Sequence, residues 1–200
     1  MAIRLTLISH ATTEAQRRAA FPLDEPLRDH ETEKISALRW NAPRVQRTLS
    51  APELRTRQTS QALGLSAEVD SDLRDCDYGA WSGFDLGEVG SSKPEEVAIW
   101  LTDPGAAPHG GESIVDLIDR VGLWLKNQRD AAHTLAVTHP AVIRAAILCA
   151  LEASPQTFWR IDIAPLSITD LRWNGRTWTL RSSGCLMPGC VLPLTVDPEH

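Results

Sequence analysis

Two histidines and an arginine each follow a short stretch that is predicted to form a β-strand. The stretches and the residues after them are 3–8 with His10, 47–50 with Arg55, and 133–138 with His139. Imidazole changes its charge near neutral pH, and guanidinium is a fixed cation that matches oxyanions. Ligands of open α/β sheets gather at the carboxyl ends of the strands. We therefore expect the three side chains to share one ligand site, although each of them taken alone is more often structural.

The elements that must position these residues alternate between strand and helix. The predicted helices span residues 53–63, 112–129 and 141–151. The last of them is apolar nearly all round, which is typical of a buried helix. Two late β-prone segments, 168–173 and 176–181, are joined by Asn-Gly, the strongest short signal for a hairpin. The pattern predicts a single α/β domain with three layers, α/β/α. Its central sheet is expected to be mostly parallel, with the hairpin closing it.

The segments between these elements are expected to be loops. Residues 85–93 and 103–111 carry the Gly, Ser and Pro typical of loops, and the stretch 83–109 is expected to form a lid over the site. From Ser182 onward the periodicity fades. We expect the domain to span 1–182 and a surface tail to span 183–200.

Composition excludes several classes of function. The chain has 200 residues and a net charge of −6, so it has no general attraction for nucleic acid. No apolar run reaches the roughly 18 residues that a membrane span needs, and the first residues do not form a signal peptide. Four unevenly spaced cysteines do not suggest a disulfide framework or a metal site. We expect a cytoplasmic protein; nothing in the sequence specifies its oligomeric state.

Five short blocks, together with Asp24-Glu25-Pro26-Leu27, match the motifs of one family in their order along the chain. The blocks are Ser9-His10-Ala11-Thr12-Thr13, residues 51–59 (APELRTRQT), residues 73–83 (LRDCDYGAWSG), Gly110-Gly111-Glu112-Ser113, and residues 138–144 (THPAVIR). Together they resemble the histidine phosphatase superfamily, also called the phosphoglycerate-mutase-like family. Five blocks in the right order are far more specific than any one of them.

The resemblance implies a role for each of four residues. His10 would be the nucleophile that forms a phosphohistidine. Arg55 would bind phosphate oxygens, and His139 would donate a hydrogen bond to the transferring phosphoryl group. Asp75 stands at the position of the general acid, with Glu112 as the runner-up. Glu112 alternatively serves as a charge favoured at a helix N-terminus. The chemistry requires no metal and no cofactor.

The first block departs from the family pattern, Arg-His-Gly-Glu-Thr. Ser9 replaces the arginine, a phosphate ligand, and the general-acid glutamate is shortened to Asp75. Losing one charge-assisted contact should cost about 1.5–3 kcal/mol, or one to two decades of rate. Residues that could compensate, or that could line the pocket, are Ser9, Thr12, Thr13, Arg17, Arg18, Arg144, Trp81 and His109. A surface location is the alternative for Arg17, Arg18 and His109.

These observations predict a phosphatase that acts on a small phosphorylated substrate through His10. A mutase is disfavoured, because nothing in the sequence indicates a site that holds both ends of a substrate and keeps water out. The altered first block leaves open a degenerate relative, weakly active or inactive, that binds a phosphorylated ligand or a protein partner.

Overall fold

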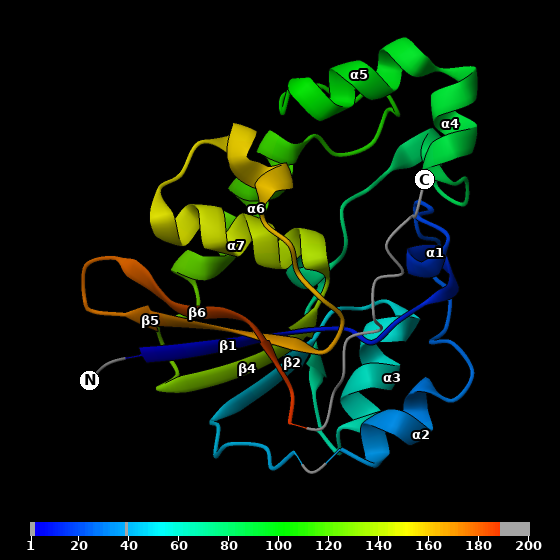
Figure 1. The fold of residues 1–200 in the computed structure, drawn as a ribbon. Helices are drawn as coiled ribbons and strands as arrows, with labels where there is room; N and C mark the ends of the chain where they lie inside the picture. Colours follow the sequence, from blue (N-terminus) through cyan, green and yellow to red (C-terminus); the bar gives the residue numbers. More distant parts are fainter. Residues whose placement is uncertain (1–2, 39, 189–200) are drawn as a thin grey trace, which may run out of the picture.

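A six-stranded sheet forms the centre of the computed structural model, which describes residues 3–38 and 40–188 (Figure 1). The strand order is β3-β2-β4-β1-β5-β6. The strands are β1 (Ile3–Ser9), β2 (Arg47–Ser50), β3 (Glu68–Val69), β4 (His133–Thr138), β5 (Ser167–Trp173) and β6 (Trp178–Leu186). The first four run parallel to one another, and β5 and β6 form an antiparallel hairpin at one edge. The expected mostly parallel sheet with a closing hairpin is confirmed.

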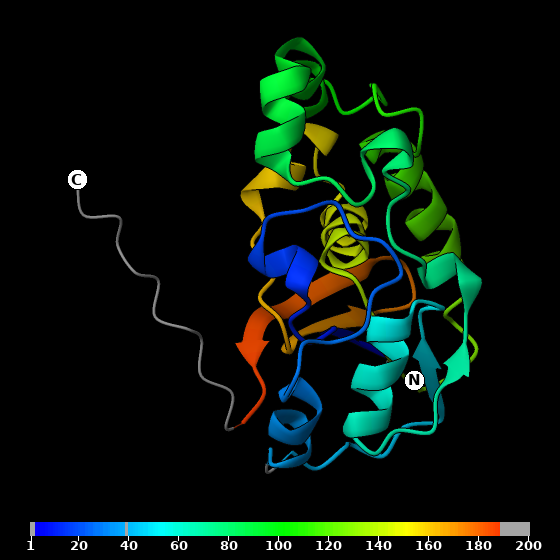
Figure 2. The ribbon, with the colours of Figure 1, turned by 90° about the vertical axis from the view of Figure 1, so that its right-hand side faces the viewer.

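Helices cover both faces of the sheet. They are α1 (Glu14–Arg17), α2 (Glu31–Ser36), α3 (Leu54–Ala62), α4 (Leu86–Ser92), α5 (Pro94–Thr102), α6 (Ile114–Lys126) and α7 (Pro140–Leu151), with 3-10 turns η1 (Ser71–Leu73), η2 (Gly79–Trp81) and η3 (Pro155–Arg160). Helices α6 and α7 lie on one face, and α2 and α3 lie on the other (Figure 1). Figure 2 shows α4 and α5 at one end of the molecule, where the start of α4 pairs with the chain after α1.

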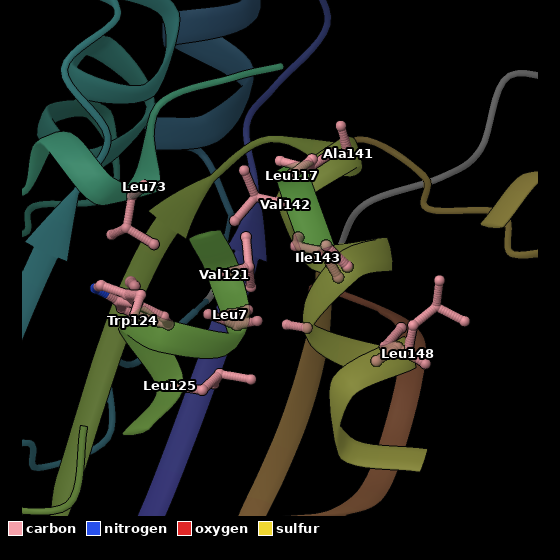
Figure 3. Close-up of a cluster of buried hydrophobic side chains, with 14 of the residues drawn as sticks. Leu7, Leu73, Leu117, Val121, Trp124, Leu125, Ala141, Val142, Ile143 and Leu148 are labelled. Carbon is pink, nitrogen blue, oxygen red and sulfur yellow. The ribbon is translucent and has the colours of Figure 1, made fainter. Parts of the chain in front are cut away.

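The sheet separates two hydrophobic clusters, because successive side chains of a strand point to opposite faces. Leu5 and Leu7 of β1 pack with Leu117 and Val121 of α6 in the larger cluster (Figure 3). Ile8, the next residue of β1, belongs to the cluster under α2 and α3. This double coverage explains why the central strands are apolar on both faces.

Local signals explain where the helices next to the site begin and end. Pro52 follows β2, and the carboxylate of Asp24 accepts a 2.6 Å hydrogen bond from the backbone N–H of Leu54 at the start of α3. Gly64, with φ +71°, follows the last turn of α3 in the left-handed conformation that glycine tolerates. Ser113 forms a capping box with Asp116 that begins α6.

The prediction of a loop over 85–93 is wrong, because this segment contains α4. Two glycines and two serines mask the helix in the sequence, but Asp85 and Glu88 form a capping box that satisfies its first backbone N–H groups. The spacing of these two acidic residues was the signal that could have revealed it. The segment 103–111 is irregular, as expected.

The expected tail does not begin at residue 183. Strand β6 continues to Leu186, so it crosses the predicted boundary at 182. Beyond Arg181 the strand reads Ser-Ser-Gly-Cys-Leu, which lacks a clear β pattern, and pairing with β5 holds it in the sheet through backbone hydrogen bonds. The rest of the predicted tail, 189–200, lies outside the described residues. Among the described residues, no helix is long and apolar enough to cross a membrane.

Candidate active site

Four predicted residues meet at the carboxyl edge of the parallel strands. His10 follows β1 directly, His139 lies between β4 and α7, and Arg55 is in the first turn of α3. Asp75 comes from the segment after η1. The rings of His10 and His139 have centroids 5.2 Å apart. Both histidines and Arg55 are almost completely buried, so this is a polar cluster inside the protein.

His10 is held as a neutral imidazole, and among the described residues only one of its two ring nitrogens has a hydrogen-bond partner. Its Nδ1 lies 2.7 Å from the carbonyl oxygen of Ala11, which can only accept a hydrogen bond, so Nδ1 carries the proton. Burial, together with the positive charges of His139 and Arg55, lowers the pKa of His10 from 6.5 to about 3. The unprotonated nitrogen is therefore Nε2, and it is available as a nucleophile at neutral pH.

Arg55 connects the site to two other segments. Its Nη2 donates a 2.7 Å hydrogen bond to Asp75 Oδ2, and its Nη1 donates one of 2.8 Å to the carbonyl oxygen of Leu23. Its Nε is buried and has no hydrogen-bond partner among the described residues. The guanidinium thus holds a carboxylate and still has donor capacity for a further oxyanion.

His139 faces a carboxylate at each of its two nitrogens. Its Nε2 lies 2.7 Å from Glu53 Oε2, and its Nδ1 lies 3.3 Å from Asp75 Oδ2 without the geometry of a hydrogen bond. Glu53 Oε1 also accepts a 3.0 Å hydrogen bond from the backbone N–H of Asp75. Sequence reasoning missed Glu53, which stands at an unspecified position of the second block, two residues before Arg55.

Both carboxyl groups are held in the ionised form. Burial raises the pKa of Asp75, but the charges of His139 and Arg55 outweigh burial, and the pKa ends below its ordinary value. Burial also raises the pKa of Glu53, and the hydrogen bond and charge of His139 outweigh it in the same way. In the resting site, two carboxylates therefore balance the cationic side chains.

The cluster opens into a pocket of about 240 Å³. His10, Arg55 and Asp75 line it with the side chains of α1 and α7. Lining residues that the sequence analysis did not propose are Ala15, Gln16, Ala20, Pro22, Tyr78, Pro140, Ala141 and Ile163. Burial raises the pKa of Tyr78 well above its usual value, so its hydroxyl stays neutral. The volume is below the roughly 300 Å³ of small drug-binding pockets, which indicates a small ligand.

Two glycines bring Tyr78 to the wall of the pocket. A Cβ on Gly79, whose φ is +47°, would lie 2.2 Å from the carbonyl oxygen of His109. A Cβ on Gly111 would lie 2.1 Å from the carbonyl oxygen of Asp77. Only glycine permits this approach, which two backbone hydrogen bonds of 2.9 and 2.8 Å stabilise. The third and fourth sequence blocks are therefore one structural unit.

The first block contributes less to the pocket than expected. Thr13 lines the pocket and caps α1, whereas Thr12 does not line it. Ser9 is fully buried, and its Oγ has no hydrogen-bond partner among the described residues. The position of the missing arginine is thus filled by a hydroxyl that does not reach the pocket wall.

Of the three cations proposed as replacements, Arg144 alone lines the pocket. Arg17 is exposed and paired with Glu14, and Arg18 lies 3.4 Å from Asp85 on the surface. Arg144 is on the second turn of α7, and side chains on a helix point back toward its N-terminus, here toward the site.

Glu112 and Trp81 lie outside the pocket. The Glu112 carboxylate accepts two hydrogen bonds of 2.8 Å from Arg120 of α6. Arg120 also donates to the carbonyl oxygens of Asp72, Arg74 and Asp75. Trp81 is buried in an aromatic cluster, with its ring centroid 5.1 Å from that of His109. His109 is itself buried, which corrects the expectation of a surface histidine. In the described part of the chain, no group of three His, Cys, Asp or Glu side chains could hold a metal ion.

The fold and the pocket define a class of protein. It is an α/β protein in which His10 and Arg55 line a small pocket at the carboxyl edge of the parallel strands. His139 is buried beside His10 and does not line the pocket. The sequence profile of the histidine phosphatase superfamily (branch 1) matches residues 5–185. The chain belongs to this superfamily.

Named relatives support the same family. The chain is 30% identical to glucosyl-3-phosphoglycerate phosphatase of Mycolicibacterium vanbaalenii over 88% of this chain and 93% of that one. It is 31% identical to the bifunctional protein Rv2228c of Mycobacterium tuberculosis over 86% of its own length, but it spans only 51% of that relative.

Solved structures share the fold. A mycobacterial glucosyl-3-phosphoglycerate phosphatase superposes with a TM-score of 0.78 at 22% identity, over 92% of this chain and 100% of that one. The alpha-ribazole phosphatase of Shigella flexneri superposes with a TM-score of 0.79 at 19% identity, over 94% of this chain and 100% of that one.

Proposed function

We propose that this protein hydrolyses a small phosphomonoester through a phosphohistidine on His10. The observation that carries the proposal is the state of His10. It is a neutral imidazole whose Nδ1–H donates a hydrogen bond to a backbone carbonyl, and it lines the pocket beside Arg55 and Asp75. The names of the relatives, which include phosphatases of glucosyl-3-phosphoglycerate and phosphoserine, support the reaction class.

In the first step, His10 Nε2 attacks phosphorus and the bond to the leaving oxygen breaks. Arg55 supplies its unpartnered Nε to a phosphoryl oxygen. Because Glu53 occupies Nε2 of His139, Nδ1 is the nitrogen left to meet the phosphoryl group. These preplaced donors meet the negative charge of the transferring group.

Asp75 supplies the proton for the leaving oxygen. In the resting site it is ionised, because Arg55 and His139 stabilise its charge. A bound phosphoryl group competes for the same two cations and adds negative charge, and both effects raise the pKa of Asp75. The protonated carboxyl then donates to the leaving oxygen, and the carboxylate later takes a proton from the water that attacks the phosphohistidine.

The test is hydrolysis of an aryl phosphate by the wild type and by His10→Ala, with a chelator present, between pH 5 and 8. We expect turnover in the wild type and its loss in the variant. Mass spectrometry of acid-labile phosphate after rapid quenching should find the phosphoryl group on His10. Equal turnover by both proteins would contradict the proposal.

A second function is favoured by one observation, the buried hydroxyl of Ser9 at the position of the phosphate-binding arginine. With one cation fewer, the site could bind a phosphorylated ligand without hydrolysing it. Calorimetric binding of inorganic phosphate, with no turnover of any tested phosphomonoester, would favour this function over hydrolysis.

A further inference from the structure

The side chain of Glu53 belongs to the active site rather than to the helix that it precedes. Glu53 stands at the start of α3, but its carboxylate makes no capping hydrogen bond to that helix. Asp24 instead accepts the hydrogen bond from the first backbone N–H, that of Leu54. The carboxylate of Glu53 is therefore free to turn into the site. Its Oε2 lies 2.7 Å from His139 Nε2, and its Oε1 accepts a 3.0 Å hydrogen bond from the backbone N–H of Asp75.

His139 is enclosed by groups that favour its doubly protonated form. Its side chain is completely buried, with Nε2 facing Glu53 and Nδ1 facing Asp75 Oδ2 at 3.3 Å. The pKa of each of these two carboxyl groups lies below its ordinary value, so both are ionised acceptors. A neutral imidazole has one N–H and would turn a lone pair toward one of the carboxylates, whereas an imidazolium has an N–H on each nitrogen. The geometry therefore favours the imidazolium.

Glu53 is the carboxylate that His139 does not share with another cation. The remaining groups that face His139 are the neutral ring of His10, whose centroid lies 5.2 Å away, and the guanidinium of Arg55. Arg55 lies 2.7 Å from Asp75 Oδ2, the same oxygen that faces His139, so Asp75 is divided between two positive charges. Among the described residues, Glu53 forms no ion pair other than the one with His139. Its negative charge thus acts mainly on that ring.

The charge of His139 matters because the first block lacks its cation. Ser9 stands where the family pattern has a phosphate-binding arginine, and its hydroxyl is buried without a hydrogen-bond partner among the described residues. His139 does not line the pocket, but Asp75 does, and His139 Nδ1 faces its carboxylate. A phosphoryl oxygen that displaces Asp75 meets Arg55 and His139 together. Water screens charges only weakly in a buried site, so a positive ring stabilises this oxygen more than it would in solution.

We propose that Glu53 is a positioning residue that holds His139 as an imidazolium, and that this cation compensates for the arginine missing at Ser9. The transferring phosphoryl group then meets two positive charges, those of Arg55 and His139. The inference rests on the proposed function, since it concerns the charge that stabilises the phosphoryl group in that reaction.

The test uses Glu53→Gln, which removes the negative charge and keeps the size of the side chain. The amide has one accepting and one donating end. Its carbonyl oxygen can accept from the backbone N–H of Asp75, and its NH2 group then donates to His139 Nε2. A ring nitrogen that accepts a hydrogen bond carries no proton, so His139 keeps its proton on Nδ1 and becomes neutral. Both hydrogen bonds of the side chain persist, and the charge alone changes.

NMR of the histidine ring nitrogens at pH 7.5 reports the charge of His139 directly, with His139→Asn used to assign its signals. The two nitrogens of an imidazolium have similar chemical shifts, whereas the unprotonated nitrogen of a neutral ring is shifted far downfield. We expect an imidazolium in the wild type and a neutral ring in Glu53→Gln. In hydrolysis of an aryl phosphate at the same pH, kcat of Glu53→Gln should be about fivefold lower, because a charge-assisted hydrogen bond becomes a neutral one.

The matched control is Glu95→Gln, the same exchange at an exposed residue of α5 that does not line the pocket. It should keep the ring signals and the kcat of the wild type. A neutral His139 in the wild type would overturn the inference, and so would identical ring signals in the wild type and Glu53→Gln. Equal kcat values in these two proteins, with the expected change in ring signals, would overturn the compensation for Ser9.

Failure of the proposed function can be told apart, because the NMR comparison needs no turnover. If the wild type hydrolyses no phosphomonoester, calorimetry with inorganic phosphate replaces kinetics. Binding of phosphate about fivefold weaker in Glu53→Gln would support the inference while phosphatase activity fails. Equal Kd values in the two proteins, or no binding of phosphate by either, would overturn it.

Discussion

The neutrality of His10 has a measurable effect on stability. The pKa of His10 is about 3 in the folded protein and 6.5 when the side chain is free in solution. Between these values, the unfolded chain binds a proton that the folded protein does not. The folded state therefore loses stability relative to the unfolded state as the pH falls below 6.5, and the group has no effect above that pH.

The loss of stability at pH 5 is set by the distance between pH 5 and 6.5, the pKa of the histidine in the unfolded chain. Each pH unit in this range changes the free energy of unfolding by about 1.4 kcal/mol, so the 1.5 units amount to roughly 2 kcal/mol. At pH 5 the folded imidazole is unprotonated whether its pKa is 3 or 4, so this magnitude barely depends on the folded value.

The assay is urea unfolding of the wild type and His10→Asn at pH 8 and pH 5, in buffers without phosphate. The asparagine amide can donate to the carbonyl of Ala11 but does not titrate. We expect the wild type to lose about 2 kcal/mol more than the variant between the two pH values. His30→Asn, which alters an exposed histidine, should behave like the wild type.

An equal loss of stability in the wild type and His10→Asn would refute the reasoning, because His10 would then take up its proton in the folded state as well. Two other histidines whose pKa is lowered by burial, His109 and the half-buried His133, are present in both proteins and cancel in the comparison. The expected difference between the two proteins also bears on catalysis, since a neutral His10 keeps its nucleophilic lone pair throughout this pH range.

Three further outcomes are expected. Arg55→Lys should lower kcat/KM about 10- to 100-fold, because lysine cannot hold two oxygen partners in the planar geometry of the guanidinium; steady-state kinetics check this. Glu53→Gln should lower kcat about fivefold with little change in KM or melting temperature, because a neutral amide orients His139 less strongly. Glu53→Leu should lower kcat further. Equal effects of the two variants on kcat would contradict a positioning role for Glu53. Leu117→Ala should cost about 2–5 kcal/mol in urea unfolding, whereas exposed Leu123→Ala should stay within about 0.5 kcal/mol.

The periodic elements were predictable because their patterns reflect burial directly. The strand 47–50 has the predicted bounds, and the helix expected over 112–129 exists as the shorter α6. The helix α4 was not predictable from periodicity, because its seven residues include two glycines and few apolar side chains. Its short length leaves a capping box as the main local signal.

The sequence by itself determined which residues follow the strands, and hence that His10, Arg55 and His139 gather at one edge of the sheet. This was possible because parallel strands place their carboxyl ends together, whatever the details of packing.

Only the tertiary structure decided which other side chains join them. Glu53 contacts His139, a residue 86 positions away, and Arg144 rather than Arg17 lines the pocket. Such contacts depend on the direction of each side chain and on the segments that pack around it. Spacing along the chain records neither, so a charged residue near a motif has the same appearance in the sequence whether it faces the pocket or the solvent.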